Sequence, residues 1–303
     1  MTPDLVREEI LRAESRIRPW ILETPLIASP LGPHFKLENR QHTGSFKTRG
    51  AFSKLLALDP PGRSRGVIAA STGNHGVAVA YAAKALGTTA RVVVSRGANP
   101  AKLAAIAGLG AALEEQGSDS AEAERYAREE ARREGIPYVS PYNDLAVIAG
   151  QGTIGLELAR QASGADVVYI ALGGGGLLAG VAAWLKSVWS GVRVVGCSPE
   201  NSPVMIASVR AGRIVELASK PTLSDGTAGG IEAGAITFPL CRDLADDYVT
   251  VTEDEILAAM VQLRDAHGFP VEGAAGVALA GYFRLRRPGE RAIVILCGGN
   301  VDW

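Results

Sequence analysis

Four short stretches of this chain combine glycines with residue types that could do chemistry. They are "TGSFK" (43–47), "STGNHG" (71–76), "GGGG" (173–176) and "CGGN" (297–300). Each lies at a junction next to a strand-like run. Ligands of open α/β sheets collect at the carboxyl ends of strands, where helix N-termini present free N–H groups. We therefore expect these stretches to contribute to ligand binding.

Lys47 is the residue among them that could act as a nucleophile. The chain has seven lysines against twenty-four arginines, yet this lysine stands among Gly44, Ser45, Thr48 and Gly50. We expect it in the first turn of a helix that continues through "RGAFSKLLAL". The positive end of a helix and a desolvated site both lower the pKa of a lysine. A neutral amine attacks aldehydes and removes protons from carbon acids, which a guanidinium cannot do.

The run of four glycines predicts a phosphate site. Without side chains the backbone can approach an anion closely, and its N–H groups and the helix dipole would hold a phosphate. A flexible turn is the simpler alternative, but it does not require four glycines, whose ordering costs entropy. These residues are Gly173, Gly174, Gly175 and Gly176.

The same loop fits the G-x-G-x-x-A pattern of dinucleotide-binding folds through Gly174, Gly176 and Ala179. That pattern requires an acidic residue at the end of the next strand, about 20 residues on. Cys197 and Ser198 end that strand instead. A nicotinamide-dependent oxidoreductase is therefore the weaker alternative.

The stretch 71–76 predicts a turn that binds a carboxylate. Ser71, Thr72, Asn74 and His75 offer hydroxyls and N–H groups where a helix begins. A helix cap needs only one such residue, so capping alone does not explain the set. A histidine in a first helical turn is often structural.

The elements between these stretches alternate. Strand-like runs at 66–70, 90–95, 166–172 and 192–198 precede helical or mixed segments, and the chain ends on the apolar "RAIVILCGGN". This alternation indicates βαβ units with parallel sheets buried on both faces, so the fold class is α/β. The first twenty residues read as an amphipathic surface helix, and residues 114–135 as a charged, exposed helix.

Composition excludes several classes of protein. The 303 residues carry a net charge of −1, which argues against nucleic-acid binding and polybasic membrane attachment. No apolar run approaches the roughly 20 residues that span a bilayer. Three separated cysteines form neither a disulfide framework nor a metal-ligand pair, and Cys297 alone would be read as a buried apolar residue. We expect a soluble, cytoplasmic protein.

A phosphate site, a carboxylate-binding turn and a buried lysine together suggest pyridoxal 5′-phosphate, which carries a phosphate and an aldehyde. The chain closely resembles the threonine/serine dehydratase family, which includes serine racemase, among the tryptophan-synthase-β-like pyridoxal phosphate enzymes of fold type II. The resemblance covers nearly the whole chain. It rests on the order and spacing of "FKLENRQHTGSFKTRGA", "STGNHG", "VIAGQGTIGLE", "GGGGLLAG", "VTEDEI" and "CGGNVD".

This resemblance implies two open twisted sheets flanked by helices, with the cofactor in the cleft between two domains. Residues 1–52 and 145–303 would form the large domain. Residues 53–144 would form the small domain, which closes over the substrate carboxylate. The family also implies a homodimer and an amino-acid substrate.

The resemblance also implies roles for particular residues. Lys47 would hold the cofactor as a Schiff base and remove the Cα proton. The residues around the cofactor would be Phe46 and Glu272 beside its ring, Asn74 at its 3′-oxygen, Gly173 to Gly176 at its phosphate and Cys297 at its pyridine nitrogen. Those at the substrate would be Ser71, Thr72, Asn74 and His75 at its carboxylate and Gly229 beside its side chain.

The implied reaction is α,β-elimination of a 3-hydroxy amino acid to a 2-oxo acid and ammonia. Racemases of the family deliver a proton from a serine where this chain has Thr72, so racemisation is the less favoured activity. A 3-hydroxyaspartate ammonia-lyase and a non-catalytic cofactor-binding protein are further alternatives. Gly229 and Gly230 replace bulkier polar residues of the racemases, which predicts a roomier pocket.

Some members of the family bind a divalent metal through carboxylates after the strand that follows the glycine loop. At the aligned positions this chain has Ser198, Ser202 and Val204, although Glu200 is close by. We therefore expect no such metal site.

Overall fold

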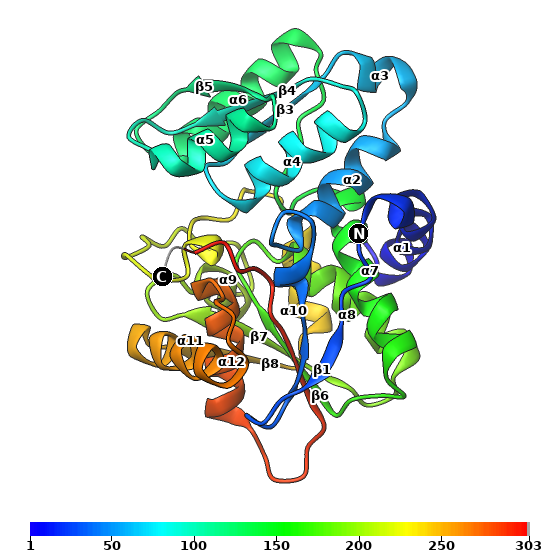
Figure 1. Ribbon diagram of the computed structural model, residues 1–303, viewed down its shortest axis with the longest axis vertical. Coiled ribbons are helices and arrows are strands. Elements are labelled where there is room, and N and C mark those ends of the chain that lie inside the picture. The colour runs from blue at the N-terminus through cyan, green and yellow to red at the C-terminus, as the bar shows by residue number, and fades with distance from the viewer. Residues whose placement is uncertain (302–303) are drawn as a thin grey trace.

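Two β-sheets, one of six strands and one of three, are found in the computed structural model, which describes residues 1–301. The strands are β1 (Leu26–Ala28), β2 (His34–Lys36), β3 (Val67–Ala70), β4 (Ala90–Val94), β5 (Ala112–Glu115), β6 (Val167–Ala171), β7 (Arg193–Pro199), β8 (Asp247–Val251) and β9 (Ala292–Ile295). The two sheets lie in separate parts of the molecule, with the smaller sheet at the top of Figure 1.

Helices surround both sheets. The α-helices are α1 (Pro3–Ile17), α2 (Lys47–Ala57), α3 (Pro60–Ser64), α4 (Asn74–Ala85), α5 (Pro100–Gly108), α6 (Ser120–Glu134), α7 (Leu145–Gln161), α8 (Gly176–Val188), α9 (Val204–Ala211), α10 (Thr237–Leu244), α11 (Glu253–His267) and α12 (Gly273–Leu285). Three 3₁₀ turns join them: η1 (Arg18–Trp20), η2 (Glu38–Arg40) and η3 (Asp225–Thr227).

The six-stranded sheet has the order β1-β2-β9-β6-β7-β8. Only β1 and β2 pair antiparallel, and the other neighbours are parallel. Every residue of β6 and β9 is buried, as expected where helices cover both faces of a parallel sheet. The predicted strands at 166–172 and 192–198 are confirmed as β6 and β7.

The three-stranded sheet is parallel, in the order β3-β4-β5. It contains the predicted strands at 66–70 and 90–95. One face packs on α6, where Ala123, Ala127 and Ala131 meet Ile68 and Val93 in a small apolar cluster. Alanines spaced four residues apart give α6 one buried face despite its many charges.

The prediction of one exposed helix over 114–135 is wrong in part. Glu114 and Glu115 end strand β5, whose backbone pairs with β4. Gly117 then turns the chain at φ +77°, and the Asp119 side chain caps the N-terminus of α6. A polar edge strand carries no apolar alternation, so its composition resembles that of the charged helix that follows.

The N-terminal helix is confirmed as amphipathic. Val6, Ile10, Ala13 and Ile17 are buried along one face of α1. This face packs mainly on α7. Such spacing places apolar residues on a single stripe of a helix.

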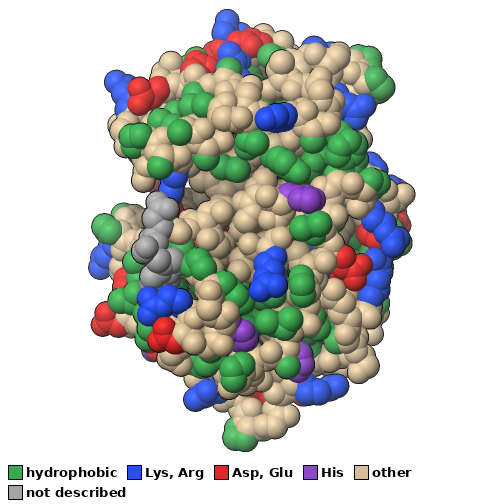
Figure 2. Space-filling view, viewed as in Figure 1, with side chains coloured by type: hydrophobic (Ala, Val, Ile, Leu, Met, Phe, Trp, Pro, Cys, Tyr) green, Lys and Arg blue, Asp and Glu red, His purple; other side chains and the backbone are tan. Residues whose placement is uncertain are grey.

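The fold brings the N-termini of three helices toward the end of β9. α2 starts at Lys47, α4 at Asn74 and α8 at Gly176. The space-filling view shows a notch between the upper and lower parts (Figure 2). Of the predicted domain boundaries, the one after residue 52 falls within α2, and the one after residue 144 coincides with the start of α7.

Candidate active site

Lys47 is held at the end of the central strand β9. The N–H of Phe46 donates to the carbonyl of Cys297 at 3.0 Å, and Ser45 forms an antiparallel bridge with Gly298. The Lys47 Nζ lies 5.2 Å from the centre of the Phe46 ring. As predicted, Lys47 is the first residue of a helix. The backbone pairing joins "TGSFK" to "CGGN" just beyond the end of β9.

The Lys47 amine is partly buried and has a lowered pKa. Its Nζ donates to the carbonyl of Pro141 at 2.9 Å. Loss of solvation lowers the pKa of Lys47 to about 8, while the carboxylates of Glu272 and Glu124 act in the opposite direction. A fraction of this amine is therefore neutral near neutral pH, which a nucleophile or base requires.

Glu272 and Cys297 form the wall next to this amine. The Cys297 Sγ lies 4.0 Å from Oε1 of Glu272. Burial raises the pKa of Glu272 to about 7 and raises the pKa of the Cys297 thiol well above its ordinary value. A Cβ added to Gly298 would overlap the Glu272 carboxyl group, so a larger residue there would require that carboxyl group to move. Cys297 is thus a neutral thiol.

Asn74 connects this wall to the smaller sheet. Its Nδ2 donates to both carboxyl oxygens of Glu272, at 3.0 and 2.7 Å. Asn300 donates from Nδ2 to Oδ1 of Asn74 at 2.7 Å, which fixes the orientation of the Asn74 amide. The motif "CGGN" contained the signal for Asn300, but sequence reasoning assigned it no role.

The four glycines form a closely packed turn between β6 and α8. Gly175 has φ +88°, a left-handed conformation that favours glycine. An added Cβ on Gly173 would come within 2.8 Å of the Thr227 backbone, and one on Gly174 would overlap the ring of Tyr142. The turn is therefore a backbone cradle at the N-terminus of a 13-residue helix, the geometry that suits a phosphate.

Tyr142 and Pro141 link the cradle to the lysine, and sequence reasoning missed both. Pro141 accepts the Lys47 hydrogen bond, and the next residue packs its ring on Gly174. The Tyr142 hydroxyl accepts a hydrogen bond from the N–H of Glu232 at 2.9 Å. The signal was the Pro-Tyr-Asn turn before α7, but its neighbours are distant in sequence.

The turn at 71–76 presents the N-terminus of α4. The Ser71 hydroxyl accepts a hydrogen bond from the N–H of Gly73 at 3.1 Å, and Thr72 is partly buried beside it. The His75 side chain instead contacts the carbonyl of Val139 at 2.8 Å. Desolvation lowers the pKa of His75 to about 3, so the ring is neutral and donates from Nε2. Only the backbone N–H of His75 is left for an anion.

Gly229 and Gly230 lie in open space. No atom lies within 4 Å of a Cβ added to either. The N–H of Gly229 donates to the Ser202 hydroxyl at 3.2 Å, and its φ of +115° disfavours other residues. The same segment reaches the cradle through Thr227, whose backbone packs on Gly173.

The positions aligned with metal ligands are engaged elsewhere. Ser198 donates to the carbonyl of Leu172 at 2.6 Å, and the Ser202 hydroxyl lies 2.7 Å from that of Ser219. Among residues 1–301 no three His, Cys, Asp or Glu side chains gather closely enough to hold a metal ion. Within the same residues no helix has the length and apolar character needed to cross a membrane.

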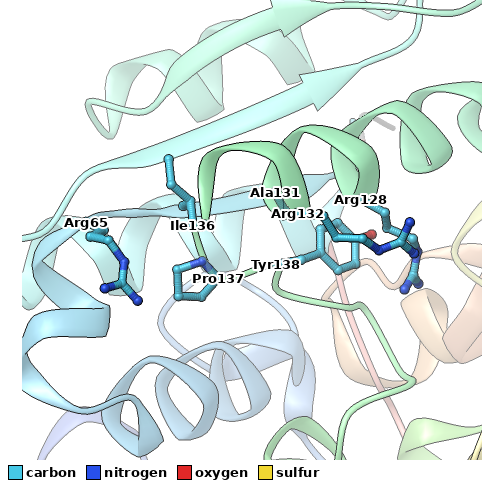
Figure 3. A pocket seen from close by; sticks show the side chains of 8 residues that line it. Arg65, Arg128, Ala131, Arg132, Ile136, Pro137 and Tyr138 are labelled. Carbon is cyan, nitrogen blue, oxygen red and sulfur yellow. The ribbon is translucent and has the colours of Figure 1, made fainter.

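A separate cavity lies over the smaller sheet, beside the C-terminal end of α6 (Figure 3). Arg128, Arg132 and Tyr138 line it, together with Arg65 from the other side. Cations near the carbonyl end of a helix stabilise its dipole, which accounts for Arg132 in the last turn. The cavity contains none of the four stretches, so it is not the candidate active site.

The fold and the site define an α/β enzyme with a partly neutral lysine near a glycine turn at a helix N-terminus. The chain belongs to the family of pyridoxal-phosphate dependent enzymes, whose model matches residues 17–298. The predicted α/β class with two sheets and the predicted cofactor class are thereby confirmed. Asp302 of the motif "CGGNVD" lies outside the described residues.

Individual relatives confirm the predicted branch of this family. The chain is 41% identical over 270 residues to an L-threonine ammonia-lyase of Thermotoga maritima, covering 89% of this chain and 67% of the relative. It is 36% identical to the catabolic L-threonine dehydratase TdcB of Escherichia coli K12, covering 97% and 93%. The structure of maize serine racemase superposes with a TM-score of 0.91 at 32% identity, covering 97% and 93%.

Proposed function

We propose that this chain is a pyridoxal phosphate-dependent ammonia-lyase that converts a 3-hydroxy amino acid of the threonine/serine type to a 2-oxo acid and ammonia. The observation that carries the proposal is Lys47, a partly buried amine with a lowered pKa beside a neutral thiol. The threonine ammonia-lyases and dehydratases among its relatives support elimination over racemisation.

The residues present fit the cofactor. The N–H groups of Gly173 to Gly176 would bind its phosphate, in a cradle that side chains would fill. The Asn74 amide would donate to the oxygen of its ring, with Phe46 and Glu272 beside the ring. Cys297 would face the ring nitrogen as a neutral thiol. When bound, pyridoxal phosphate supplies the electron sink for cleavage at the substrate Cα.

The chain itself would position the substrate and move its proton. The N-terminus of α4, with Ser71, Thr72 and the backbone N–H of His75, would bind the substrate carboxylate. The neutral amine of Lys47 would take the Cα proton. The open space at Gly229 and Gly230 would accept a side chain larger than that of serine.

Serine racemase activity is the second candidate, favoured by the similarity to maize serine racemase. Thr72 disfavours racemase activity, because a β-branched side chain has a restricted χ1 angle and moves less freely than serine to deliver a proton. A 3-hydroxyaspartate ammonia-lyase would act through the same residues. Measuring D-enantiomer formation beside 2-oxo acid release, for serine and 3-hydroxyaspartate, separates the three.

We propose the same domains as above, with residues 53–144 closing over the substrate carboxylate, and a homodimeric, cytoplasmic enzyme. Two contacts support closure from the smaller sheet. Asn74 reaches Glu272, and Arg128 forms an ion pair with Glu232 at 2.8 Å. The three free, buried cysteines fit a reducing compartment.

The test is the absorbance spectrum of the purified protein with pyridoxal phosphate. We expect a visible band in the wild type, its loss in Lys47→Ala and its retention in Lys84→Ala, which removes an exposed lysine. Turnover of threonine or serine should fall more than about 1,000-fold in Lys47→Ala alone. A wild type that stays colourless with added cofactor contradicts the proposal.

A further inference from the structure

Four charged side chains lie together inside the protein, and the proposed reaction uses none of them. They are Lys36 on β2, Glu38 on η2, Arg49 on α2 and Glu157 on α7. Glu157 is 4% exposed and the other three are fully buried. Two cations face two carboxylates, so the cluster is electrically balanced.

Arg49 is the centre of this cluster. Its Nε and Nη2 donate to the two carboxyl oxygens of Glu38, at 2.8 and 2.9 Å. Its Nη1 donates to Oε1 of Glu157 at 2.6 Å. Lys36 then donates to Oε2 of Glu157 at 2.5 Å and to the carbonyl of Thr24 at 2.7 Å. The planar guanidinium therefore fixes both carboxylates, a geometry that lysine cannot reproduce.

Stability alone does not account for such a cluster. Removing charges from water costs several kcal/mol per ion, and well-packed apolar residues of similar volume often stabilise a protein equally or better. The best-attested use of buried polar groups is to fix one register between elements.

The Arg49–Glu38 pair joins the helix of Lys47 to the strand end that carries Cys297. Arg49 is two residues after Lys47, in the first turn of α2. On the other side, Asn39 follows Glu38 and its N–H donates to the carbonyl of Leu296 at 2.9 Å. Leu296 directly precedes Cys297. The two hydrogen bonds between Arg49 and Glu38 therefore connect the lysine to the thiol through a short series of contacts.

We propose that the Arg49–Glu38 pair is a positioning device for Lys47, holding α2 in the register that keeps Nζ against Pro141 and beside Cys297. Arg49 and Glu38 act through Lys47 and touch no reacting atom. This proposal depends on the proposed function only because that function gives Lys47 its chemical role. The second pair, Lys36–Glu157, also contacts Arg49, whose Nη1 and Nη2 donate to Glu157. Replacing it leaves the Arg49–Glu38 pair in place, so it serves as an internal comparison.

Two charge-balanced double variants test this. Arg49→Met/Glu38→Gln removes the proposed device, whereas Lys36→Met/Glu157→Gln removes one cation and one anion from the same cluster. Cyanate reacts with neutral amines, so carbamylation of Lys47 in the cofactor-free full-length chain, followed by peptide mass spectrometry across pH, reports its pKa. We expect a midpoint near 8 in the wild type and the comparison variant. We expect a rise toward 10.5 in Arg49→Met/Glu38→Gln, where the amine gains solvent.

Kinetics of the cofactor-loaded enzyme give the second measurement. A misplacement of about 1 Å costs about 100-fold, so kcat should fall by that factor in Arg49→Met/Glu38→Gln and far less in the comparison variant. Equal midpoints and equal kcat in two folded variants overturn the proposal. A wild type that binds no cofactor refutes the proposed function. The carbamylation midpoints, measured without cofactor, still support or overturn the positioning role.

If Arg49→Met/Glu38→Gln does not fold, Arg49→Lys tests the positioning role instead. It keeps the buried charge but loses the fork to Glu38. We expect a cooperative thermal transition together with the same upward shift of the Lys47 midpoint. A folded Arg49→Lys protein with the wild-type midpoint and kcat would overturn the positioning role.

Discussion

Lys36 and Lys47 are both at least partly withdrawn from solvent, and their hydrogen-bond partners suit them to different roles. Lys36 is fully buried, and Lys47 is partly buried. Desolvation lowers the pKa of both. Lys36, however, donates to the Glu157 carboxylate and is committed to an ion pair, whereas Lys47 donates to a neutral carbonyl. Burial beside neutral partners, rather than burial alone, leaves an amine free for chemistry.

Glu272 gives a prediction at the scale of one residue. Its pKa is raised to about 7 from an ordinary 4.5, chiefly by burial. The folded state therefore holds the proton more tightly, and the resulting stability is present below pH 4.5 and lost as pH rises through about 7. In cofactor-free protein, the unfolding free energy of the wild type should fall by about 3 kcal/mol relative to Glu272→Gln over this range. Urea unfolding at several pH values measures it.

The glutamine retains an oxygen that accepts from Asn74, so this variant isolates the titration from the hydrogen bond. Parallel pH profiles for the two proteins would show that Glu272 does not titrate in this range. Opposite slopes, with the wild type gaining stability as pH rises, would show a pKa lowered by Asn74 and Lys47 instead.

Single residues also show where sequence reasoning ends. The place of Lys47 at the start of a helix could be predicted, because the residues that follow it form a helical pattern. The direction of the His75 side chain could not, because it depends on Val139, sixty-four residues away. The cluster around Arg49 was likewise missed, since burial of a charge is decided by partners on three other elements.

At the scale of an element, the glycine turn requires glycine for packing reasons that can be tested. Gly174→Ala would place a methyl group in the Tyr142 ring and force either the ring or the turn to move. We expect cofactor affinity to fall about tenfold or more, by misplacing the N–H groups of the cradle. Titration of the cofactor-free protein with pyridoxal phosphate measures the affinity.

Gly108→Ala is the matched control for this substitution. Gly108 ends α5, and an added Cβ there would meet no atom within 4 Å. It should bind the cofactor as the wild type does. If Gly174→Ala also binds the cofactor with wild-type affinity, the Tyr142 ring moves aside easily and its packing does not position the cradle.

The elements themselves could be predicted where apolar pattern decided them. The runs that became β3, β4, β6 and β7 are mostly apolar, because helices cover both faces of their sheets. Strand β5, "ALEE", could not be recognised, since an edge strand with polar residues has the composition of the helix after it. Pairing with β4, rather than any local signal, makes it a strand.

At the scale of the whole molecule, two ion pairs join the helices of the smaller sheet to the segment beside the glycine turn. Lys102 on α5 contacts Asp225 at 2.9 Å, and Arg128 on α6 contacts Glu232 at 2.8 Å. The first pair is exposed, with side chains 44% and 66% accessible, and the second is mostly covered, at 22% and 23%. Only the second should hold the two parts together appreciably, because water screens the first.

Two double-mutant cycles on kcat/KM separate these pairs. Arg128→Met, Glu232→Gln and their combination should show a coupling of about 1 kcal/mol, roughly fivefold, that shrinks at high salt. The corresponding Lys102→Met and Asp225→Asn cycle should show no more than about 0.3 kcal/mol. We expect the loss of kcat/KM to appear mainly as a higher KM, because the backbone N–H of Glu232 also donates to Tyr142, which packs on the cradle.

Equal coupling energies in the two cycles would mean that exposure does not decide which ion pair holds the two parts together. Coupling confined to kcat would instead place Arg128 in the chemical step.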